Sequence, residues 1–489
     1  MPQPLEPGKP LVAQREPPYS DRAEPWRVKV VEPIRRTTRE ARERLLKAAG
    51  YNLFALKAED VFVDLLTDSG VGAMSADQWA GMMVGDESYA GARNFYSLQD
   101  SVRDVMGFGH VLPAHQGRGA EHVLCAALLK RGDIVPSNAL FDTTRAHIEH
   151  VGATGVDLLL ETAYDTKDEL PFKGDIDLAA LEALLGRAKP GQVPFAVMTV
   201  TCNMTGGQPV SMQNVREASK LLGAHGVPLI IDAARFAENS WFVKEREPGY
   251  EERTILEIAR VLFGYAAGCT MSAKKDGLVN IGGFLAFRDG EMYEKCLPFG
   301  ILFEGYATYG GLAGRDLEAM ARGLREGVDE AYLKSRTDQV RYLGERLQAA
   351  GVPVLVPIGG HAVYVDAGRF LPHVPWYEFP GHALACALYL ESGVRAVEIG
   401  SLMAARDPET HENRQARMEL MRLALPRRMY TDNHIDYVVQ ALAALYARRE
   451  EVAGVELVRE APVLRHFTSS FRPVLRGKSA GGSASPVPS

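Results

Sequence analysis

The sequence has few cysteines and lacks the histidine and cysteine spacings that bind metals. Its five cysteines are scattered through 489 residues, are odd in number and form no C-x-x-C pair. Its twelve histidines form no H-E-x-x-H motif. These absences argue against a disulfide framework and against a zinc site. They predict a reducing compartment, and we expect a cytoplasmic protein.

Long apolar runs and an excess of basic charge are also missing. No uninterrupted apolar stretch is long enough to span a bilayer, and the first 20 residues lack the apolar core of a secretory signal. The formal net charge of -7 gives no electrostatic reason to bind nucleic acid or an anionic membrane. We therefore expect the partners to be small molecules rather than nucleic acid or membrane.

The length of 489 residues exceeds what one compact core usually holds. Residues 1–25 are rich in proline and predict a flexible leader, and the Gly/Ser/Pro-rich residues 476–489 predict a flexible tail. Between them we predict a large domain over 58–325. A smaller domain is predicted from 26–57 together with 326–475.

Two short apolar runs separated by a helical segment predict a parallel sheet. The runs cover 194–200 and 227–232, and neither shows the polar alternation of a half-exposed strand. Residues 211–226 between them have a helical pattern that ends at a glycine. Strand, helix and strand in this order form a βαβ unit. The predicted fold class is therefore α/β.

Two further helices are predicted outside this unit. Thr37 and Glu40 have the spacing of a capping box, and Gly50 follows as a stop signal, so we expect a helix over 37–50. The stretch over 316–350 is rich in Leu, Ala, Glu and Arg and predicts one long helix.

Polar residues follow the apolar runs at the positions where parallel sheets bind ligands. Asn203 follows the first run, and Asp232 with Arg235 follows the second. A lysine pair, Lys274 and Lys275, follows a third run near residue 270. Because ligands bind beyond the carboxyl ends of parallel strands, these side chains are expected to converge at one rim of the sheet.

This set of residues suits pyridoxal phosphate (PLP). A lysine amine forms a Schiff base with PLP, and a buried aspartate keeps the pyridine nitrogen protonated. We expect Lys274 to lower the pKa of Lys275 through like charge. Taken alone, Asp232 reads more readily as a helix cap and the lysine pair as a solvated surface. Their order, with each at a strand end, favours the cofactor site.

The chain from residue 24 to about residue 471 resembles the β-eliminating lyases, the family of tryptophanase and tyrosine phenol-lyase. The resemblance is carried by separated strings: LLTDSG (65–70), GDESYAG (85–91), HQGRGAE (115–121), GGQPVS (206–211), DAARFAEN (232–239), MSAKKD (271–276), TYGGL (308–312) and VLRHFT (463–468). It implies the aminotransferase-like, type I PLP fold, with a large domain on a mostly parallel sheet and a smaller α/β domain. It also implies a homotetramer and a monovalent cation such as potassium.

The resemblance also implies roles for individual residues at the cofactor. Lys275 matches the Schiff-base lysine, and Asp232 matches the partner of the pyridine nitrogen. The other residues matched to the cofactor site are Arg235, Asn203, Phe141, Gln116, Gly117, Arg118 and Ser272.

Further residues match the substrate and cation sites of the family. Arg422 matches the arginine that binds the substrate carboxylate, and Tyr89 matches the proposed acid to the leaving ring. Thr67, Asn203 and Ile399 match other substrate contacts. Gly70, Glu87 and Asn280 match the monovalent-cation site.

Three positions favour indole over phenol as the leaving group. Asp142 and His466 follow tryptophanase, where phenol-lyases carry Thr and Phe. Ile399 stands where phenol-lyases place an arginine. An indole N–H needs an acceptor such as Asp142, whereas a phenolate oxygen needs a cation. The resemblance therefore implies β-elimination of L-tryptophan to indole, pyruvate and ammonia.

Alternatives remain open at this stage. The strings AGCTMSAKKDGLVNIGGF and GGLAGRDLEAMA look more like the phenol-lyase branch. A tyrosine phenol-lyase, or a lyase with broad activity on cysteine and serine derivatives, would use the same chemistry. A PLP-binding sensor without turnover is the alternative from another class, and the full set of expected catalytic residues argues against it.

Overall fold

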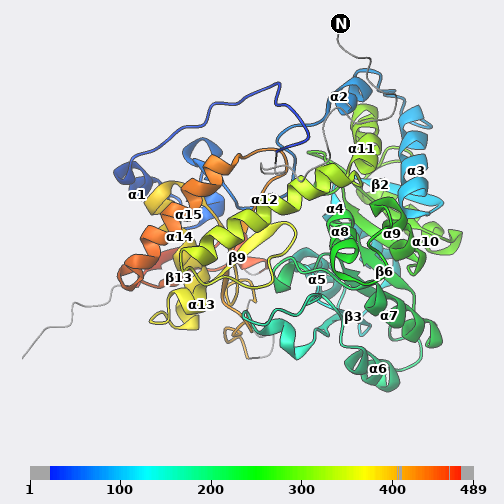
Figure 1. The fold of residues 1–489 in the computed structure, drawn as a ribbon. Coiled ribbons are helices and arrows are strands. Elements are labelled where there is room, and N and C mark those ends of the chain that lie inside the picture. The colour runs from blue at the N-terminus through cyan, green and yellow to red at the C-terminus, as the bar shows by residue number, and fades with distance from the viewer. Residues whose placement is uncertain (1–22, 405, 407–409, 462, 475–489) are drawn as a thin grey trace, which may run out of the picture.

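The computed structural model describes residues 23–404, 406, 410–461 and 463–474 (Figure 1). Most of the predicted leader over 1–25 and the predicted tail over 476–489 lie outside the described residues. Among the described residues, no helix is long and apolar enough to cross a membrane.

A seven-stranded, mostly parallel sheet forms the centre of the molecule. Its strand order is β2-β8-β7-β6-β5-β3-β4, and only β8 runs antiparallel to its neighbours. The strands are β2 (His110–Ala114), β3 (Ile134–Ser137), β4 (Thr154–Asp157), β5 (Ala196–Thr199), β6 (Leu229–Asp232), β7 (Gly268–Ser272) and β8 (Gly283–Phe287). The predicted βαβ unit is confirmed, because β5 and β6 pair in parallel on either side of α7.

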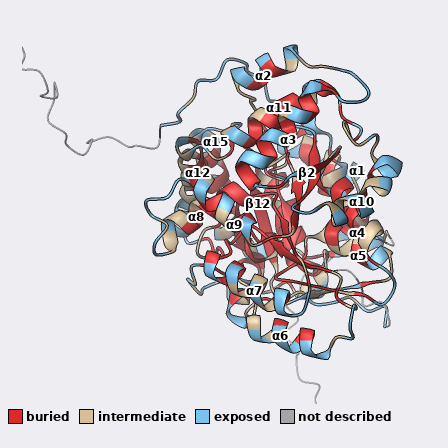
Figure 2. Cartoon of the chain, turned by 90° about the vertical axis from the view of Figure 1, so that its right-hand side faces the viewer, coloured by how far each residue is buried: buried red, intermediate tan, exposed pale blue. Residues whose placement is uncertain are grey.

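Both faces of this sheet are buried, as the lack of polar alternation predicts. Along β6, Leu229 and Ile231 pack into one apolar layer and Ile230 packs into the other. Figure 2 shows the buried strands inside the molecule and the exposed faces of the helices outside them. The helices of these layers are α3 (Arg93–Met106), α4 (Gly117–Leu128), α5 (Asp142–His150), α6 (Leu178–Arg187), α7 (Met212–Ala224), α8 (Phe236–Arg246), α9 (Ile255–Gly264), α10 (Gly290–Phe303) and α11 (Gly314–Glu326).

A second apolar cluster is built from both ends of the chain. Its buried members come from 46–65 and 340–471, whereas the largest cluster draws its members from 95–333. A three-stranded antiparallel sheet in the order β11-β12-β9 lies in this part. The strands here are β1 (Val63–Asp64), β9 (Ala362–Asp366), β10 (Val394–Arg395), β11 (Val397–Ile399), β12 (Leu420–Ala424), β13 (Val455–Arg459) and β14 (Ser470–Pro473).

The other helices include α2 (Ala76–Met83), which packs on α11 in the central-sheet part, and α12 (Glu330–Ala349), which contacts both α8 and β9. In Figure 1, α12 runs across the molecule between the two parts. The remaining helices are α1 (Arg39–Ala48), α13 (Ala367–Phe370), α14 (Pro380–Ser392) and α15 (Asp432–Ala447).

The structure corrects two details of the predicted helices. The cap of α1 is Thr38, whose hydroxyl accepts from the Ala41 N–H at 3.3 Å, so the predicted capping box of Thr37 and Glu40 is wrong: the cap lies one residue later and Ala41 has no side chain to complete a box. The predicted single helix over 316–350 is two helices, α11 and α12. The chain turns at Gly327, where an added Cβ would lie 2.1 Å from the Asp276 carbonyl oxygen, and Asp329 then caps α12.

Candidate active site

Three neighbouring parallel strands deliver polar residues to one edge of the central sheet. Asp232 is the last residue of β6, and Lys275 lies three residues beyond the end of β7. Asn203 begins a short 3-10 helix, Asn203–Thr205, that follows β5. Since β5, β6 and β7 are adjacent and parallel, their carboxyl ends meet at this edge.

The Lys275 amine lies among charged side chains at this edge. Its Nζ donates a hydrogen bond to the Ser272 hydroxyl at 2.9 Å. Burial and the Arg235 guanidinium lower the pKa of Lys275 to about 8, while Asp68 and Asp232 oppose this shift. The expected cause, like charge on Lys274, is therefore not the main one. A lower pKa leaves more of the amine unprotonated and nucleophilic at neutral pH.

Asp232 is a buried carboxyl with cations beside it. Burial raises its pKa, and a hydrogen bond from the Ala234 N–H and the charges of Lys275 and Arg235 work against that rise. Asp232 in turn acts on a second buried acid, Glu121 of α4: burial together with Asp232 raises the pKa of Glu121 to about 7. A cation placed against Asp232 would stabilise its ionised form.

The start of α4 lies directly against Ser272. An added Cβ on Gly117 would be 2.6 Å from the Ser272 Cβ, so only glycine allows this approach. Gln116 precedes the first turn of α4 and Arg118 follows Gly117 in it. A helix N-terminus offers unpaired N–H groups and positive potential, which suits a phosphate. The four predicted phosphate-binding residues are therefore brought together.

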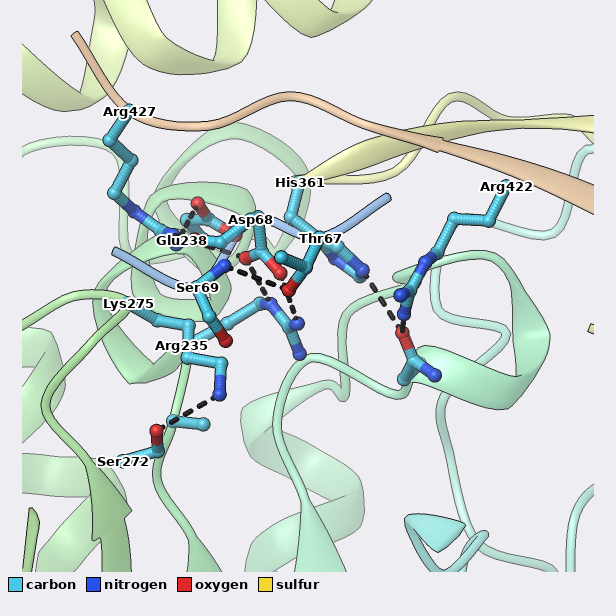
Figure 3. A network of polar contacts seen from close by, with 12 residues as sticks. Thr67, Asp68, Ser69, Arg235, Glu238, Ser272, Lys275, His361, Arg422 and Arg427 are labelled. Atoms are coloured by element: carbon cyan, nitrogen blue, oxygen red, sulfur yellow. Dashed lines mark hydrogen bonds and ion pairs between the residues drawn. The ribbon is translucent and has the colours of Figure 1, made fainter. Parts of the chain in front are cut away.

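A buried ion network surrounds Arg235. Asp68 accepts two hydrogen bonds from Arg235, at 2.8 Å from Nε and 2.7 Å from Nη2. Arg427, which has no exposed surface, donates to Asp68, to Glu238 at 2.6 Å and to Asp276 at 2.9 Å. Figure 3 shows this network beside Lys275 and Arg422. The network fixes the orientation of the Arg235 guanidinium.

Arg422 and Asn203 form a second buried cluster. Arg422 donates to the Asn203 Oδ1 at 2.8 Å and to the Leu66 carbonyl at 3.0 Å. The Tyr364 hydroxyl also donates to Asn203 Oδ1, at 2.9 Å, and His361 Nε2 lies 3.1 Å from it. Two donors here, Asn203 Nδ2 and Arg422 Nε, are buried without a partner among the described residues. A buried donor without a hydrogen-bond partner lowers the stability of the fold unless a bound molecule supplies an acceptor.

The predicted leaving-group residues come together from distant parts of the chain. Phe141 and Asp142 begin α5, and His466 lies in the 3-10 helix Arg465–Phe467. His466 is 4% exposed, and its Nε2 is 3.3 Å from the Asp142 Oδ2, without hydrogen-bond geometry. Ile399 is 2% exposed and lies on the same face of its sheet as Arg422.

Five of the predicted site residues are exposed in this chain: Thr67, Glu87, Tyr89, Arg118 and Asn280. Tyr89 is 69% exposed and its ring packs against Tyr306 and Tyr309, with centroid distances of 5.8 and 5.0 Å. Thr67 is exposed, and its hydroxyl accepts from the Ser69 N–H at 3.0 Å.

The predicted cation ligands are brought together only in part. Asn280 Oδ1 accepts from the Val71 N–H at 3.0 Å, and an added Cβ on Gly70 would lie 2.8 Å from the same oxygen. Glu87 instead binds the start of α11, accepting from the Gly314 N–H at 2.7 Å.

The residues present fit PLP on three independent observations. The start of α4 against Ser272 suits its phosphate, the buried Asp232 suits its protonated ring nitrogen, and the unpartnered Asn203 Nδ2 suits a ring oxygen. The Lys275 amine lies within electrostatic range of Asp232. The donor set therefore matches each functional group of this cofactor.

Sequence reasoning missed several residues of the site. Asp68 lies inside the string LLTDSG and Glu238 inside DAARFAEN, yet neither was singled out. Arg427, His361 and Tyr364 were missed as well, because a lone buried polar residue has no local pattern. The only available signal was membership of a matched string.

Comparisons with known proteins agree with this geometry. The β-eliminating lyase family profile matches residues 64–441. The tyrosine phenol-lyase of Symbiobacterium thermophilum is 51% identical over 92% of this chain and 99% of its own length. The tryptophanases of Hyphomonas neptunium and Salinibacter ruber are each 53% identical over 92% of this chain, covering 98% and 95% of their own lengths.

Solved structures show the same fold at low identity. A serine palmitoyltransferase from Sphingomonas wittichii has a TM-score of 0.55 and 15% identity, over 84% of this chain and 97% of that one. A high-resolution structure of SPT with the PLP internal aldimine has a TM-score of 0.56 and 14% identity, over 84% of this chain and 96% of that one. The predicted aminotransferase-like α/β fold is confirmed.

Proposed function

The chain belongs to the β-eliminating lyase family, and from that premise we propose that it cleaves L-tryptophan with water into indole, pyruvate and ammonia. The observation that carries this choice is Asp142, held beside His466 at 3.3 Å, with the uncharged Ile399 near Arg422. A carboxylate acceptor suits the indole N–H, whereas a phenolate oxygen would need a cation.

Nine residues would hold PLP in this proposal. Gln116, Gly117, Arg118 and Ser272 would bind its phosphate, Phe141 would stack on its ring, and Asn203 and Arg235 would bind its ring oxygen. Lys275 would bond its carbonyl carbon and Asp232 would face its ring nitrogen. Bound in this way, PLP supplies an electron sink for the bonds that break at the substrate's Cα and Cβ.

Arg422 would bind the substrate carboxylate. A planar guanidinium forms two parallel hydrogen bonds with a carboxylate, which also fixes its orientation. The unpartnered Nε of Arg422 supports this role, since the anion would supply the missing acceptor. Thr67 follows Leu66, whose carbonyl accepts from Arg422, so we place Thr67 at the same end of the substrate.

Lys275 and an acid near the indole would move the protons. The unprotonated amine of Lys275 would remove the Cα proton, a role that its lowered pKa supports. Asp142 would accept the indole N–H while the C3 carbon receives a proton. We assign that proton to Tyr89 or, through water, to His466.

We propose a cytoplasmic homotetramer that uses a monovalent cation such as potassium. Tyr89 and Tyr306 stack on each other at the surface, and the exposed apolar side chains of Met83 and Leu302 also support subunit contacts. The proposed cation ligands are Gly70, Glu87 and Asn280, and the approach of Gly70 to Asn280 supports two of them. The separate apolar clusters support two domains, proposed as 58–325 and 26–57 with 326–475, although residues 61–65 pack in the second cluster and residues 332–333 in the largest one.

The alternative is a tyrosine phenol-lyase or a lyase of cysteine and serine derivatives, which the similarity to tyrosine phenol-lyases favours. Incubating the enzyme with L-tryptophan and L-tyrosine separately decides between them. We expect indole and pyruvate in equal amounts from L-tryptophan. Phenol from L-tyrosine at a higher kcat/KM would overturn the proposed substrate.

A further inference from the structure

The segment that follows Ile399 is held between two carboxyl groups, the buried Glu398 and the partly buried Glu419. An added Cβ on Gly400 would lie 2.6 Å from Glu398 Oε1 and 2.5 Å from Glu419 Oε2. The two acids come from paired strands, β11 and the residue just before β12. Gly400 is therefore enclosed by carboxyl oxygens on two sides, with no room for a side chain.

Both carboxyl groups accept hydrogen bonds from the two residues that follow Gly400. The Ser401 hydroxyl donates to Glu419 Oε1, and the Leu402 N–H donates to Glu398 Oε1 at 3.0 Å. Burial raises the pKa of Glu419 to about 7, and burial together with Glu419 raises the pKa of Glu398 well above its usual range. A protonated carboxyl beside the other avoids the repulsion of two neighbouring anions.

Arg465 binds the same segment from its other side. Its Nε donates to the Leu402 carbonyl at 2.7 Å and its Nη2 to the Ser401 carbonyl at 2.8 Å. Glu460 accepts from Nη1 at 2.8 Å, which fixes the guanidinium further. Arg465 is 2% exposed, so these charge-assisted bonds form in a dry environment where they are strong.

Glu398, Glu419 and Arg465 together hold residues 400–402, and we call these three side chains the clamp. The clamp joins the residues proposed to select the leaving group. Ile399 directly precedes the clamped segment, and His466 directly follows Arg465 in the chain. His466 in turn lies 3.3 Å from Asp142, which belongs to the central-sheet part of the molecule. The two hydrogen bonds from Arg465 therefore connect the segment that follows Ile399 to the segment that contains His466.

The geometry points to Glu419, Ser401 and Arg465 as positioning residues that set the shape of the leaving-group pocket between Ile399, His466 and Asp142. They act through the residues that they hold and are not proposed to touch the substrate. The inference rests on the proposed function, because it assigns the pocket wall to an aromatic leaving group.

The test compares an aromatic substrate with one whose leaving group is small. Arg465→Lys keeps the charge but cannot bond both carbonyls, and Ser401→Ala removes the hydroxyl bonded to Glu419. For each variant, kcat/KM is measured with L-tryptophan and with S-methyl-L-cysteine. We expect the tryptophan value to fall about tenfold or more, and the cysteine-derivative value to stay within about threefold.

The control is Arg472→Lys, which changes an exposed arginine paired with Glu456 and should alter neither value. An equal loss for both substrates in Ser401→Ala, or no change in the ratio, would overturn the positioning role. If Arg465→Lys does not fold in a thermal melt, Ser401→Ala decides the question alone.

Failure of the proposed function is visible separately in the unmodified enzyme. If that enzyme prefers L-tyrosine, the proposed substrate is wrong, and the positioning role is judged by the same ratio with L-tyrosine. If it cleaves only the cysteine derivative, both proposals fall, because no aromatic leaving group is selected.

Discussion

Asp68 binds Arg235 through both of its carboxylate oxygens, at 2.8 Å to Nε and 2.7 Å to Nη2, and both side chains are buried. The pair connects the segment that follows β1 with the segment that follows β6. It holds the arginine near Lys275, and the charge of that arginine helps to lower the Lys275 pKa. The pair therefore links the stability of the fold to the state of the amine at the proposed cofactor site.

Asp68→Asn is expected to lower the free energy of unfolding by about 3 kcal/mol, because it leaves buried cationic groups without their anion. It should also weaken PLP binding by freeing Arg235 to change its orientation. Urea unfolding and cofactor titration measure these two effects. Asp100→Asn, at an exposed pair with Arg103, is the control and should cost less than about 1 kcal/mol.

Lys275 should make PLP uptake by the cofactor-free protein depend on pH. Since the pKa of Lys275 is lowered to about 8, the unprotonated fraction rises with pH up to that value and then levels off. The rate of uptake, followed by cofactor absorbance, should rise about tenfold per pH unit below pH 8. Lys274→Ala should leave the midpoint unchanged. A midpoint near the ordinary lysine value would contradict the assigned environment.

Glu121 should make stability fall as pH rises in the cofactor-free protein. Its folded pKa is raised to about 7 from an ordinary 4.5, so the folded chain binds this proton more tightly than the unfolded chain. The contribution of Glu121 to the free energy of unfolding is fully present below about pH 4.5. It declines by about 3 kcal/mol as the pH rises to about 7. The unfolding free energy of the unmodified protein minus that of Glu121→Gln measures this decline. A difference that increases with pH would refute the shift.

Ile399→Arg should shift preference from L-tryptophan towards L-tyrosine. The side chain is 2% exposed on the face that also carries Arg422, so an introduced cation would face the leaving group rather than solvent. The ratio of the two kcat/KM values should change by about tenfold or more towards tyrosine. Ile399→Met, which keeps an apolar side chain of similar size, should leave the ratio nearly unchanged.

Local patterns predicted the elements that carry the cofactor residues. The unbroken apolar runs of β5 and β6 indicated buried parallel strands. Because ligands bind beyond the carboxyl ends of such strands, Asn203, Asp232 and Lys275 could be predicted as site residues. These inferences succeed because periodicity and strand order depend on neighbouring residues. The break between α11 and α12 was missed from the sequence. Gly327 keeps helical dihedral angles (φ -62°, ψ -20°), and the Asp276 carbonyl that packs against it lies about fifty positions away in the chain, where no local pattern shows the contact.

The residues around the cofactor site that had no local pattern could not be predicted from the sequence. Asp68, Glu238 and Arg427 read as ordinary charged residues until the structure buries them against one another. Asp142 and His466 were selected by resemblance, and only their 3.3 Å separation shows that they lie side by side.

The sequence by itself determined the α/β class, the family and the residues at the strand ends, because each follows from the order of side chains along short segments. The tertiary structure decided which charges are buried, why the Lys275 pKa is lowered, and how Arg465 reaches the segment after Ile399. Those properties arise only when distant segments exclude water together, since desolvation and Coulombic energies depend on separation in space.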